Sequence, residues 1–479
     1  MSERLRARDL AVLAGESPTT PRHNATVEVF EPGESGFDYA RLVELVADRI
    51  SFVPRYRQRL APVPGRLANP VWVDDPDFDI GYHVRRSALP RPGSPEQLFE
   101  LVGRIVARPL DRHRPLWEVY LVEGLEGGRL ALLSKAHEVL VDGVHTVDLA
   151  QVLLDRTAEP RPFHQDDWHP LSAPSPAGLV AGAVQDAVTD PSTVVDTARA
   201  SLDSAWRAAE SVAGRLGQVA GALTNRRPAN STLGGHLSQQ RRIVTVRTDL
   251  RDYLEVRREH GGTVNDAILA TVTGALRGWL LGRSESMSGV RSIRTVVPVS
   301  VRDRELENTS LGSPIEPYLV DLPVGEASPV VRLHQVSYQF QAHKDTGRAV
   351  AANRLAGIAG FAPSTFHAIG ARVAADEVRR GFQLSVTNVP GPQSPLYAAG
   401  ARMVETYPVH PLLPGHALAI GVTSYDGQVF YGITADYDRV PDAEVLAQSV
   451  PEALTELLDT IGGRTKAPRG RRSRKKKGR

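Results

Sequence analysis

Strand-like and helix-like segments alternate along two long stretches of this chain, one ending near residue 155 and the other beginning near residue 242. Apolar, β-branched runs predict strands, and apolar residues recurring with a period near 3.6 predict helices. In the first stretch we expect strands at residues 25–32, 117–125 and 129–137, and helices at residues 38–51, 95–110 and 143–155. This alternation predicts an α/β fold with mixed sheets.

The second stretch shows the same mixture of elements, although no residue-level repeat relates it to the first. The expected strands are residues 241–250, 294–302, 318–323, 382–391 and a hairpin over 418–437 that turns at Asp426 and Gly427. The expected helices are residues 252–261, closed by Gly261, and residues 263–282, 330–344 and 442–458.

A proline-rich segment from residue 159 and an Ala/Val-rich segment with helical spacing separate the two stretches. We therefore expect two domains joined by a helical crossover. The expected borders are residues 1–160 for the first domain, 161–235 for the linker and crossover helices, 236–462 for the second domain, and 463–479 for a disordered basic tail.

The last sixteen residues contain ten Lys or Arg side chains and no acid. The net charge of +2 minus these ten positive charges leaves a body with a net charge of −8. An acidic body does not favour a nucleic-acid-binding fold, so no nucleic-acid partner is expected. The tail has three open interpretations: a solubilising end, attraction to anionic lipid head groups, or, third, contact with nucleic acid.

Several classes of protein and site are excluded by residue content. The chain has no cysteine, which excludes disulfides, thiolate zinc sites and a cysteine nucleophile. Charges run through the first nine residues, so we expect no signal peptide. Residues 406–425 are uncharged and long enough to span a bilayer, but they contain three prolines and two histidines, so no spanning helix is expected.

The segment KAHEVLVDG, residues 135–143, combines a histidine, two acids and a glycine at the end of the expected strand 129–137 and in the residues that follow it. Its first part resembles the zinc motif H-E-x-x-H, in which two histidines one helical turn apart bind the metal. Val141 stands where the second histidine would be. We therefore expect no metal site here.

Seven segments, in this order along the chain, resemble the bacterial wax ester synthase/diacylglycerol acyltransferase family, which belongs to the CoA-dependent acyltransferases built like chloramphenicol acetyltransferase. They are PLDRHRPLWEVYLVEGL (109–125), KAHEVLVDG (135–143), TVNDAILA (263–270), VPVSVR (297–302), LGSPIEPYLVDLP (311–323), TNVPGP (387–392) and SYDGQVFYGITAD (424–436). The resemblance implies two chloramphenicol-acetyltransferase-like domains with the active site in a tunnel between them.

It also implies an acyl-CoA-dependent O-acyltransferase that makes triacylglycerol from diacylglycerol, or wax ester from a long-chain alcohol. The acyl-CoA is a substrate, and no metal or other cofactor is expected. An enzyme that acts on insoluble lipids must reach them, so we expect a cytoplasmic protein that associates peripherally with a membrane or lipid droplet. The basic tail is the expected contact with an anionic lipid surface.

The family motif is H-H-x-x-x-D-G, whose second histidine is the general base, and here Glu138 occupies that position after His137. Three interpretations remain open. Glu138 acts as a carboxylate base; or its presence abolishes acyl transfer and leaves an acyl-lipid-binding homologue; or the catalytic role has passed to His137 or His145. Glu138 and His137 are thus the candidate catalytic residues.

The remaining candidates follow from the motifs. Asp142 and Gly143 are expected to hold the motif loop in shape. Asn265 and Asp266 open an expected helix, where they either cap it or, as the resemblance implies, line the acyl tunnel. Ser313 stands where the family usually has Asn in the sequence L-G-N, and it is either a tolerated change in a loop or a candidate substrate-binding residue. The segment from Asn388 to Pro392 has the composition of a turn.

Overall fold

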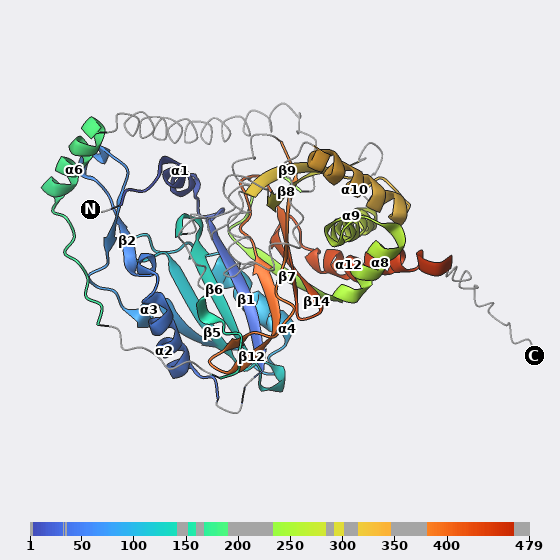
Figure 1. Cartoon of the computed structure of the whole chain (residues 1–479), viewed down its shortest axis with the longest axis horizontal. Coiled ribbons are helices and arrows are strands. Elements are labelled where there is room, and N and C mark those ends of the chain that lie inside the picture. Colours follow the sequence, from blue (N-terminus) through green and yellow to red (C-terminus); the bar gives the residue numbers. More distant parts are fainter. Residues whose placement is uncertain are drawn as a thin grey trace, which may run out of the picture.

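The structure is a computed structural model that describes residues 3–31, 33, 36–140, 152–159, 167–189, 233–283, 292–300, 315–345 and 381–463. Two six-stranded mixed sheets form its body. Figure 1 shows them side by side, with the first sheet on the left and the second on the right. The expected α/β fold with mixed sheets is therefore confirmed.

The first sheet has the strand order β11–β12–β1–β6–β5–β4. Its strands are β1 (His23–Glu31), β4 (Val84–Ala88), β5 (Trp117–Glu123), β6 (Leu130–His137), β11 (Tyr397–Ala398) and β12 (Ala401–Val409). All neighbours are antiparallel except β4 and β5. A separate hairpin-like pair is formed by β2 (Gln58–Ala61) and β3 (Val71–Asp74).

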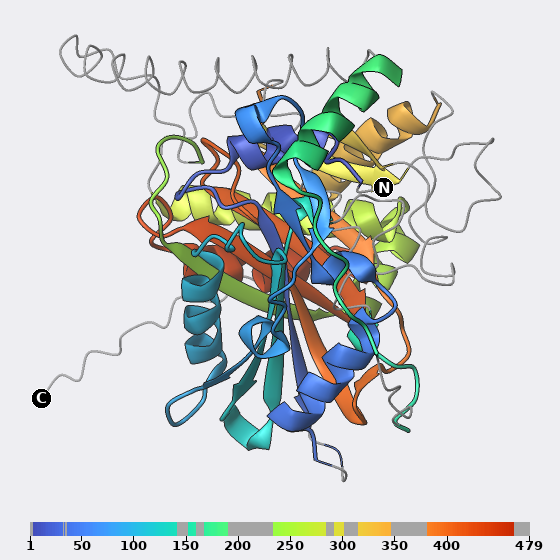
Figure 2. The ribbon, with the colours of Figure 1, turned by 90° about the vertical axis from the view of Figure 1, so that its left-hand side faces the viewer.

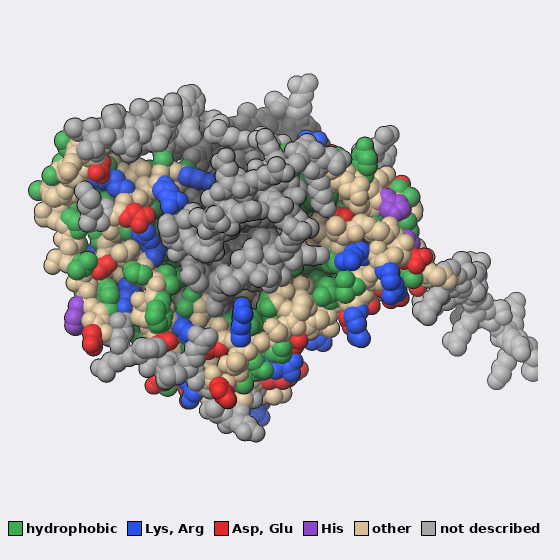
Figure 3. All heavy atoms as spheres, viewed as in Figure 1, with side chains coloured by type: hydrophobic (Ala, Val, Ile, Leu, Met, Phe, Trp, Pro, Cys, Tyr) green, Lys and Arg blue, Asp and Glu red, His purple; other side chains and the backbone are tan. Residues whose placement is uncertain are grey.

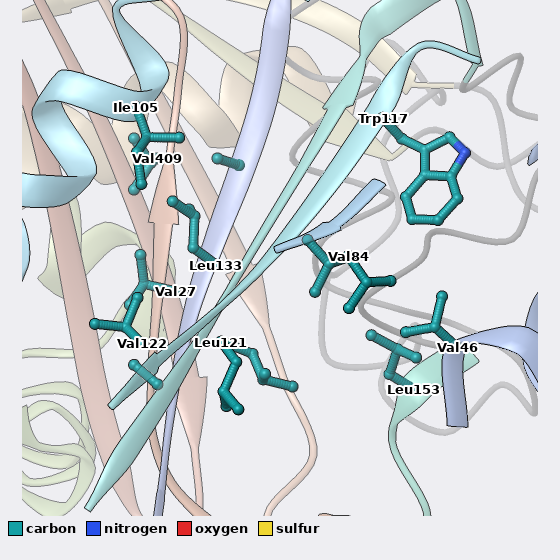
Figure 4. Packing of buried hydrophobic residues seen from close by; sticks show 14 of the residues in the cluster. Val27, Val46, Val84, Ile105, Trp117, Leu121, Val122, Leu133, Leu153 and Val409 are labelled. Atoms are coloured by element: carbon teal, nitrogen blue, oxygen red, sulfur yellow. The ribbon is translucent and has the colours of Figure 1, made fainter. Parts of the chain in front are cut away.

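Helices cover both faces of the first sheet. They are α2 (Tyr39–Ile50) and α4 (Pro95–Val106), with α1 (Ala7–Gly15) and the short α3 (Ile80–His83) at its margins. Figure 2 shows α2 and α4 on opposite sides of the strands. In Figure 4, Ile105 of α4 lies with Val27, Leu133 and Val409 on one face, and Val46 of α2 lies toward Val84 on the other. All of these side chains are buried, so the sheet is the middle layer of one continuous core.

Two strands of the first sheet come from the second half of the chain. β12 pairs with β1 over its length, with Val27 opposite Tyr407 and Ala25 opposite Val409, and β11 extends the same edge. The expected borders at residues 1–160 and 236–462 did not include this exchange. Its physical reason is burial, because Tyr407 and Val409 complete the apolar face under α4.

The second sheet has the order β7–β14–β13–β10–β8–β9. Its strands are β7 (Arg241–Asp249), β8 (Ile293–Ser300), β9 (Ile315–Leu322), β10 (Leu384–Pro390), β13 (Leu418–Tyr425) and β14 (Gln428–Asp436). The expected hairpin is confirmed, with Asp426 and Gly427 both at positive φ. Asn388 to Pro390 lie in β10, so the expectation of a turn is wrong there, because this segment pairs along β13.

Four helices pack on the second sheet: α8 (Leu250–His260), α9 (Val264–Gly282), α10 (Pro329–Asp345) and α12 (Ala443–Leu458). Figure 1 shows all four on the side away from the first sheet. The long helix α9 is the most deeply buried, since apolar residues occur all round it. Gly261 ends α8 at φ 78°, as the sequence predicted.

A pair of glycines lets the two sheets approach each other. Gly421 of β13 lies directly opposite Gly432 of β14, and the end of β12 crosses them. A Cβ atom on Gly432 would lie 1.8 Å from the carbonyl oxygen of Pro408, and one on Gly421 would lie 2.7 Å from the His410 ring. Only glycine permits this crossing.

The remaining elements are α6 (Pro176–Thr189), within the expected crossover, and the 3-10 turns η1 (Pro54–Arg57), η2 (Pro64–Arg66), η3 (Glu126–Gly128), η4 (Glu138–Leu140) and η7 (Ile461–Gly463). Residues 406–425 form parts of β12 and β13 with their connection. No helix in the described part of the chain is both long enough and apolar enough to span a membrane. The expected helix at 143–155 lies largely outside the described residues, as does the basic tail.

Candidate active site

The motif histidine lies where the first sheet approaches the second. His137 is the last residue of β6 and stands opposite His23, the first residue of β1. Residues directly opposite each other in an antiparallel pair project to the same face. The end of β12 and the start of β7 lie nearby: Asn24 Oδ1 is 3.4 Å from His410 Nδ1, and Arg241 of β7 reaches the loop before β1.

Glu138 follows β6 in the turn η4, and its side chain is completely buried. Arg22 Nη2 donates a 2.6 Å hydrogen bond to Glu138 Oε2, and Arg22 Nε donates a second one of 3.2 Å. The backbone of Glu138 is also fixed, since its N–H donates to the Arg22 carbonyl at 3.0 Å. Glu138 Oε1 accepts no hydrogen bond from any described residue. One carboxylate oxygen is therefore held, and the other has a free acceptor position within the described structure.

Both nitrogens of the His137 ring face protein groups. Nδ1 accepts a 3.2 Å hydrogen bond from the Val139 N–H, so in the neutral ring the proton resides on Nε2. Nε2 lies 3.5 Å from Glu16 Oε2. The His137 backbone N–H donates to the Leu116 carbonyl. Nε2 makes no hydrogen bond with any described residue, so a catalytic role for His137 stays a prediction.

Glu16 is a buried acid that the sequence analysis did not single out. Burial acts to raise the pKa of its carboxyl, but His137, Arg112 and the backbone N–H of Arg22 together hold that pKa well below its usual range. Arg112 Nη2 donates to Glu16 Oε2 at 2.5 Å, and the Arg22 N–H donates to Oε1 at 3.0 Å. Glu16 is therefore an ionised carboxylate facing the His137 ring.

Two basic side chains on the same face hold the end of α4. His23 Nε2 lies 2.8 Å from the Val106 carbonyl, and burial lowers the pKa of this imidazole well below its usual range. Lys135 Nζ donates to the carbonyls of Ile105 and Arg108, and burial lowers its pKa to about 8. Ile105 and Val106 are the last residues of α4 and Arg108 follows it closely, so these bonds dock the end of α4 on the sheet beside the motif.

The helix α9 begins with the second predicted group. Thr263 and Asp266 form a capping box, in which each side chain accepts a hydrogen bond from the backbone N–H of the other. The capping interpretation of Asp266 is therefore confirmed. Asn265 is half-buried, and its Oδ1 accepts a 2.9 Å hydrogen bond from Asn388 Nδ2. The structure thus joins two predicted segments, TVNDAILA and TNVPGP, while a tunnel-lining role for Asn265 and Asp266 stays a prediction.

The other predicted site residues cannot be placed. Asp142, Gly143, His145 and Ser313 lie outside the described residues. Among the described residues, no group of three or more His, Asp or Glu side chains is placed to hold a metal ion.

Sequence reasoning missed Glu16, Arg22, Arg112 and Arg241, the charged residues that surround the motif. Each lies in a loop or at a strand end, where charge is usually solvent-exposed. No local sequence signal indicates that any of them is buried, including Arg22, which directly precedes a histidine and an apolar strand. Its burial depends on Glu138, which lies 116 residues away in the chain.

Comparison with known proteins agrees with this architecture. The wax ester synthase/diacylglycerol acyltransferase catalytic domain model matches residues 5–268, and the C-terminal domain model of the same family matches residues 312–458. A probable diacylglycerol O-acyltransferase of Mycobacterium tuberculosis, tgs1, is 35% identical over 435 residues, covering 91% of each chain. A second, tgs3, is 40% identical over 260 residues, covering 54% of this chain and 96% of that protein.

Solved structures share the fold. The wax ester synthase/diacylglycerol acyltransferase from Marinobacter aquaeolei VT8 superposes with a TM-score of 0.65 at 24% identity, covering 95% of this chain and 98% of that one. The first condensation domain of the CDA synthetase superposes with a TM-score of 0.54 at 16% identity, covering 96% and 97%. The fold is thus of the two-domain, chloramphenicol-acetyltransferase-like class. Within that class, the chain belongs to the wax ester synthase/diacylglycerol acyltransferase family.

Proposed function

We propose that this chain transfers the acyl group of an acyl-CoA to the hydroxyl of diacylglycerol or of a long-chain alcohol, with Glu138 as the general base. Membership of the family and the relatives' names as diacylglycerol O-acyltransferases support the reaction class. The observation that carries the role of Glu138 is its geometry: Arg22 holds Oε2, while Oε1 has no partner among the described residues.

The proposed steps need only the substrates and this chain's side chains. Glu138 Oε1 accepts the proton of the acceptor hydroxyl as its oxygen attacks the thioester carbonyl carbon. The tetrahedral oxyanion then collapses, the carbon–sulfur bond breaks, and the CoA thiolate takes the proton back from Glu138. The products are the new ester and CoA thiol, and the carboxylate returns to its starting state.

Arg22 supplies the positive charge that a carboxylate base lacks. When Glu138 accepts the proton it becomes neutral and the negative charge passes to the oxyanion, whereas a histidine base would become a cation beside that oxyanion. A positive charge about 4 Å from the oxyanion lowers its energy by about 4 kcal/mol at an effective dielectric constant of about 20, which corresponds to roughly a thousandfold in rate. The Arg22 guanidinium, which donates to Glu138 Oε2 at 2.6 Å, places a positive charge directly beside the base.

Purified protein incubated with labelled palmitoyl-CoA and either diacylglycerol or hexadecanol tests the reaction. We expect labelled triacylglycerol or wax ester to form with equimolar release of CoA thiol. The Glu138→Gln variant tests the role of the base in the same assay. Its matched control is Glu444→Gln, because Glu444 forms a partly exposed ion pair with Arg242 on the second sheet. No transfer to either acceptor, together with retained binding of palmitoyl-CoA, would instead establish the non-catalytic acyl-lipid-binding homologue.

We also propose that the basic residues 464–479 attach the protein peripherally to an anionic membrane or lipid-droplet surface. Figure 3 shows basic and acidic side chains interspersed over the described part of one face, whereas the tail sequence has ten Lys or Arg residues and no acid. Each basic residue near an anionic surface contributes on the order of 1 kcal/mol. The charges attract only within the Debye length, about 8 Å at physiological salt.

Vesicle sedimentation tests this attachment. Deleting residues 464–479 should release the protein from phosphatidylserine-containing vesicles, and high salt should release the full chain in the same way. Phosphatidylcholine vesicles are the control. Binding that is unchanged by both the deletion and the salt would refute the proposal.

A further inference from the structure

Residues 16–22, the clip loop that joins α1 to β1, have a shape fixed by their own hydrogen bonds. Ser17 and Thr20 exchange backbone hydrogen bonds of 3.4 and 3.0 Å, and their side-chain oxygens lie 2.7 Å apart. The Glu16 carboxylate accepts from the Arg22 N–H and so closes the loop. These bonds connect the clip loop internally from its first residue to its last.

Both motif residues depend on this loop. Glu16 at its start faces the His137 ring, and Arg22 at its end holds Glu138. A displacement of the clip loop would therefore move the partners of both motif side chains together.

The clip loop is held from outside by an arginine of the second sheet. Arg241, the first residue of β7, donates from Nη2 to the carbonyl oxygen of Thr19 at the outer corner of the loop. Its Nη1 lies 3.4 Å from Asp436 Oδ2 and donates to the carbonyls of Ser238 and Gln240. The side chains of Arg241 and Asp436 are both buried, so the guanidinium is fixed on all sides.

A second contact keeps the start of β7 against the first half of the molecule. A Cβ atom on Gly103 of α4 would lie 2.7 Å from the Arg241 carbonyl oxygen. The absence of a side chain at Gly103 allows helix and strand to touch at this point. The backbone of Arg241 is thus fixed by α4 while its side chain reaches the clip loop.

We propose that Arg241 is a positioning residue, which transmits the location of the second sheet through the clip loop to Glu138 and so makes acyl transfer depend on contact between the two sheets. This inference rests on the proposed function. It predicts that loosening Arg241 lowers turnover while substrate binding is kept, because misplacing a catalytic group by about 1 Å can cost up to about a hundredfold in rate.

The test compares Arg241→Gln and Arg241→Lys with Arg242→Gln in the full chain. Arg242 is the neighbouring residue on β7, but its ion pair with Glu444 is partly exposed. We expect Arg241→Gln to lower kcat about tenfold with KM for palmitoyl-CoA within about twofold. The kcat of Arg241→Lys should lie between that of Arg241→Gln and that of the parent. A single ammonium group cannot replace the guanidinium, which reaches both Asp436 and Thr19.

Hydrogen exchange of the amides of residues 16–24 supplies a readout that does not need activity. We expect faster exchange there in Arg241→Gln and parent-like exchange in Arg242→Gln. If Arg241→Gln does not fold, Arg241→Lys carries both measurements.

Unchanged exchange and unchanged kcat in the Arg241 variants would overturn the proposal, and so would equal effects in Arg242→Gln. A tenfold loss from Arg241→Gln that persists undiminished in the Glu138→Gln background would also overturn it, since Arg241 would then not act through Glu138. An inactive parent would refute the proposed function alone, because hydrogen exchange would still test the link.

Discussion

Replacing Arg22 by methionine should destabilise the protein strongly, because it leaves the Glu138 carboxylate buried without a partner. The two side chains are 7% and 0% exposed, and both Arg22 hydrogen bonds go to the same carboxylate oxygen. Removing one partner of a buried ion pair typically costs about 3–5 kcal/mol. With a urea m-value of roughly 3 kcal/mol/M, the unfolding midpoint should fall by about 1–1.7 M.

The double variant Arg22→Met with Glu138→Gln tests whether the loss of stability comes from the unpaired charge of Glu138. Its unpaired buried group is a neutral amide, whose desolvation costs about 1–3 kcal/mol, less than that of a charge. The double variant should therefore be more stable than Arg22→Met alone by about 2 kcal/mol. Arg242→Met, which breaks a partly exposed pair, should cost less than about 1 kcal/mol.

Urea unfolding followed by far-ultraviolet circular dichroism at neutral pH measures five proteins: the parent, the single variants Arg22→Met and Glu138→Gln, the double variant, and Arg242→Met. An Arg22→Met midpoint within about 0.3 M of the parent, corresponding to about 1 kcal/mol, would refute the buried pair. Simple additivity in the double variant would refute it as well, because coupled charges give non-additive effects.

Two further predictions concern packing and pH. Gly103→Ala should lower the free energy of unfolding in urea by about 1–3 kcal/mol, because its Cβ would lie 2.7 Å from the Arg241 carbonyl oxygen. Gly278→Ala is the control. Its Cβ would lie 3.5 Å from Ser449 Oγ, so this variant should be neutral or slightly stabilising. The pKa of Glu16 is lowered on folding, so its contribution to stability is present above its unfolded pKa of about 4.5 and is lost as the pH falls below that value. The stability difference between the parent and Glu16→Gln should therefore shrink from about pH 6 to about pH 3, and a constant difference would contradict this.

Local chemistry explains which parts of the fold were predictable. The capping box of α9 lies within four consecutive residues, and the hairpin turn at Asp426 and Gly427 needs only two residues at positive φ. Periodicity likewise located β1, β6 and α4, because one buried face leaves a repeating apolar pattern.

Long-range pairing explains what was missed. β12 joins β1 across more than 370 residues of chain, and nothing within its own sequence specifies which sheet it completes. The position of the end of β12 can be predicted only together with Gly421 and Gly432, because their lack of side chains makes room for Pro408. Such complementarity exists between segments, so it becomes visible only when both are placed.

The candidate site divides in the same way. The position of Glu138 followed from a motif of seven consecutive residues. Its partner Arg22 did not, because an arginine in a loop carries no sequence sign of burial. In the sequence Glu138 is only a residue that differs from the family motif, whereas in the structure it forms a buried ion pair with Arg22.

The most direct test of the account measures acyl transfer by the parent, Glu138→Gln and Glu138→His with palmitoyl-CoA and diacylglycerol. If Glu138 is the general base, the parent is active and Glu138→Gln loses about 10²- to 10⁴-fold in kcat with little change in KM. An inactive parent that gains activity in Glu138→His would contradict the account, because the carboxylate would then be the reason for inactivity. An active parent that is indifferent to Glu138→Gln would contradict it equally and direct attention to His137 and His145.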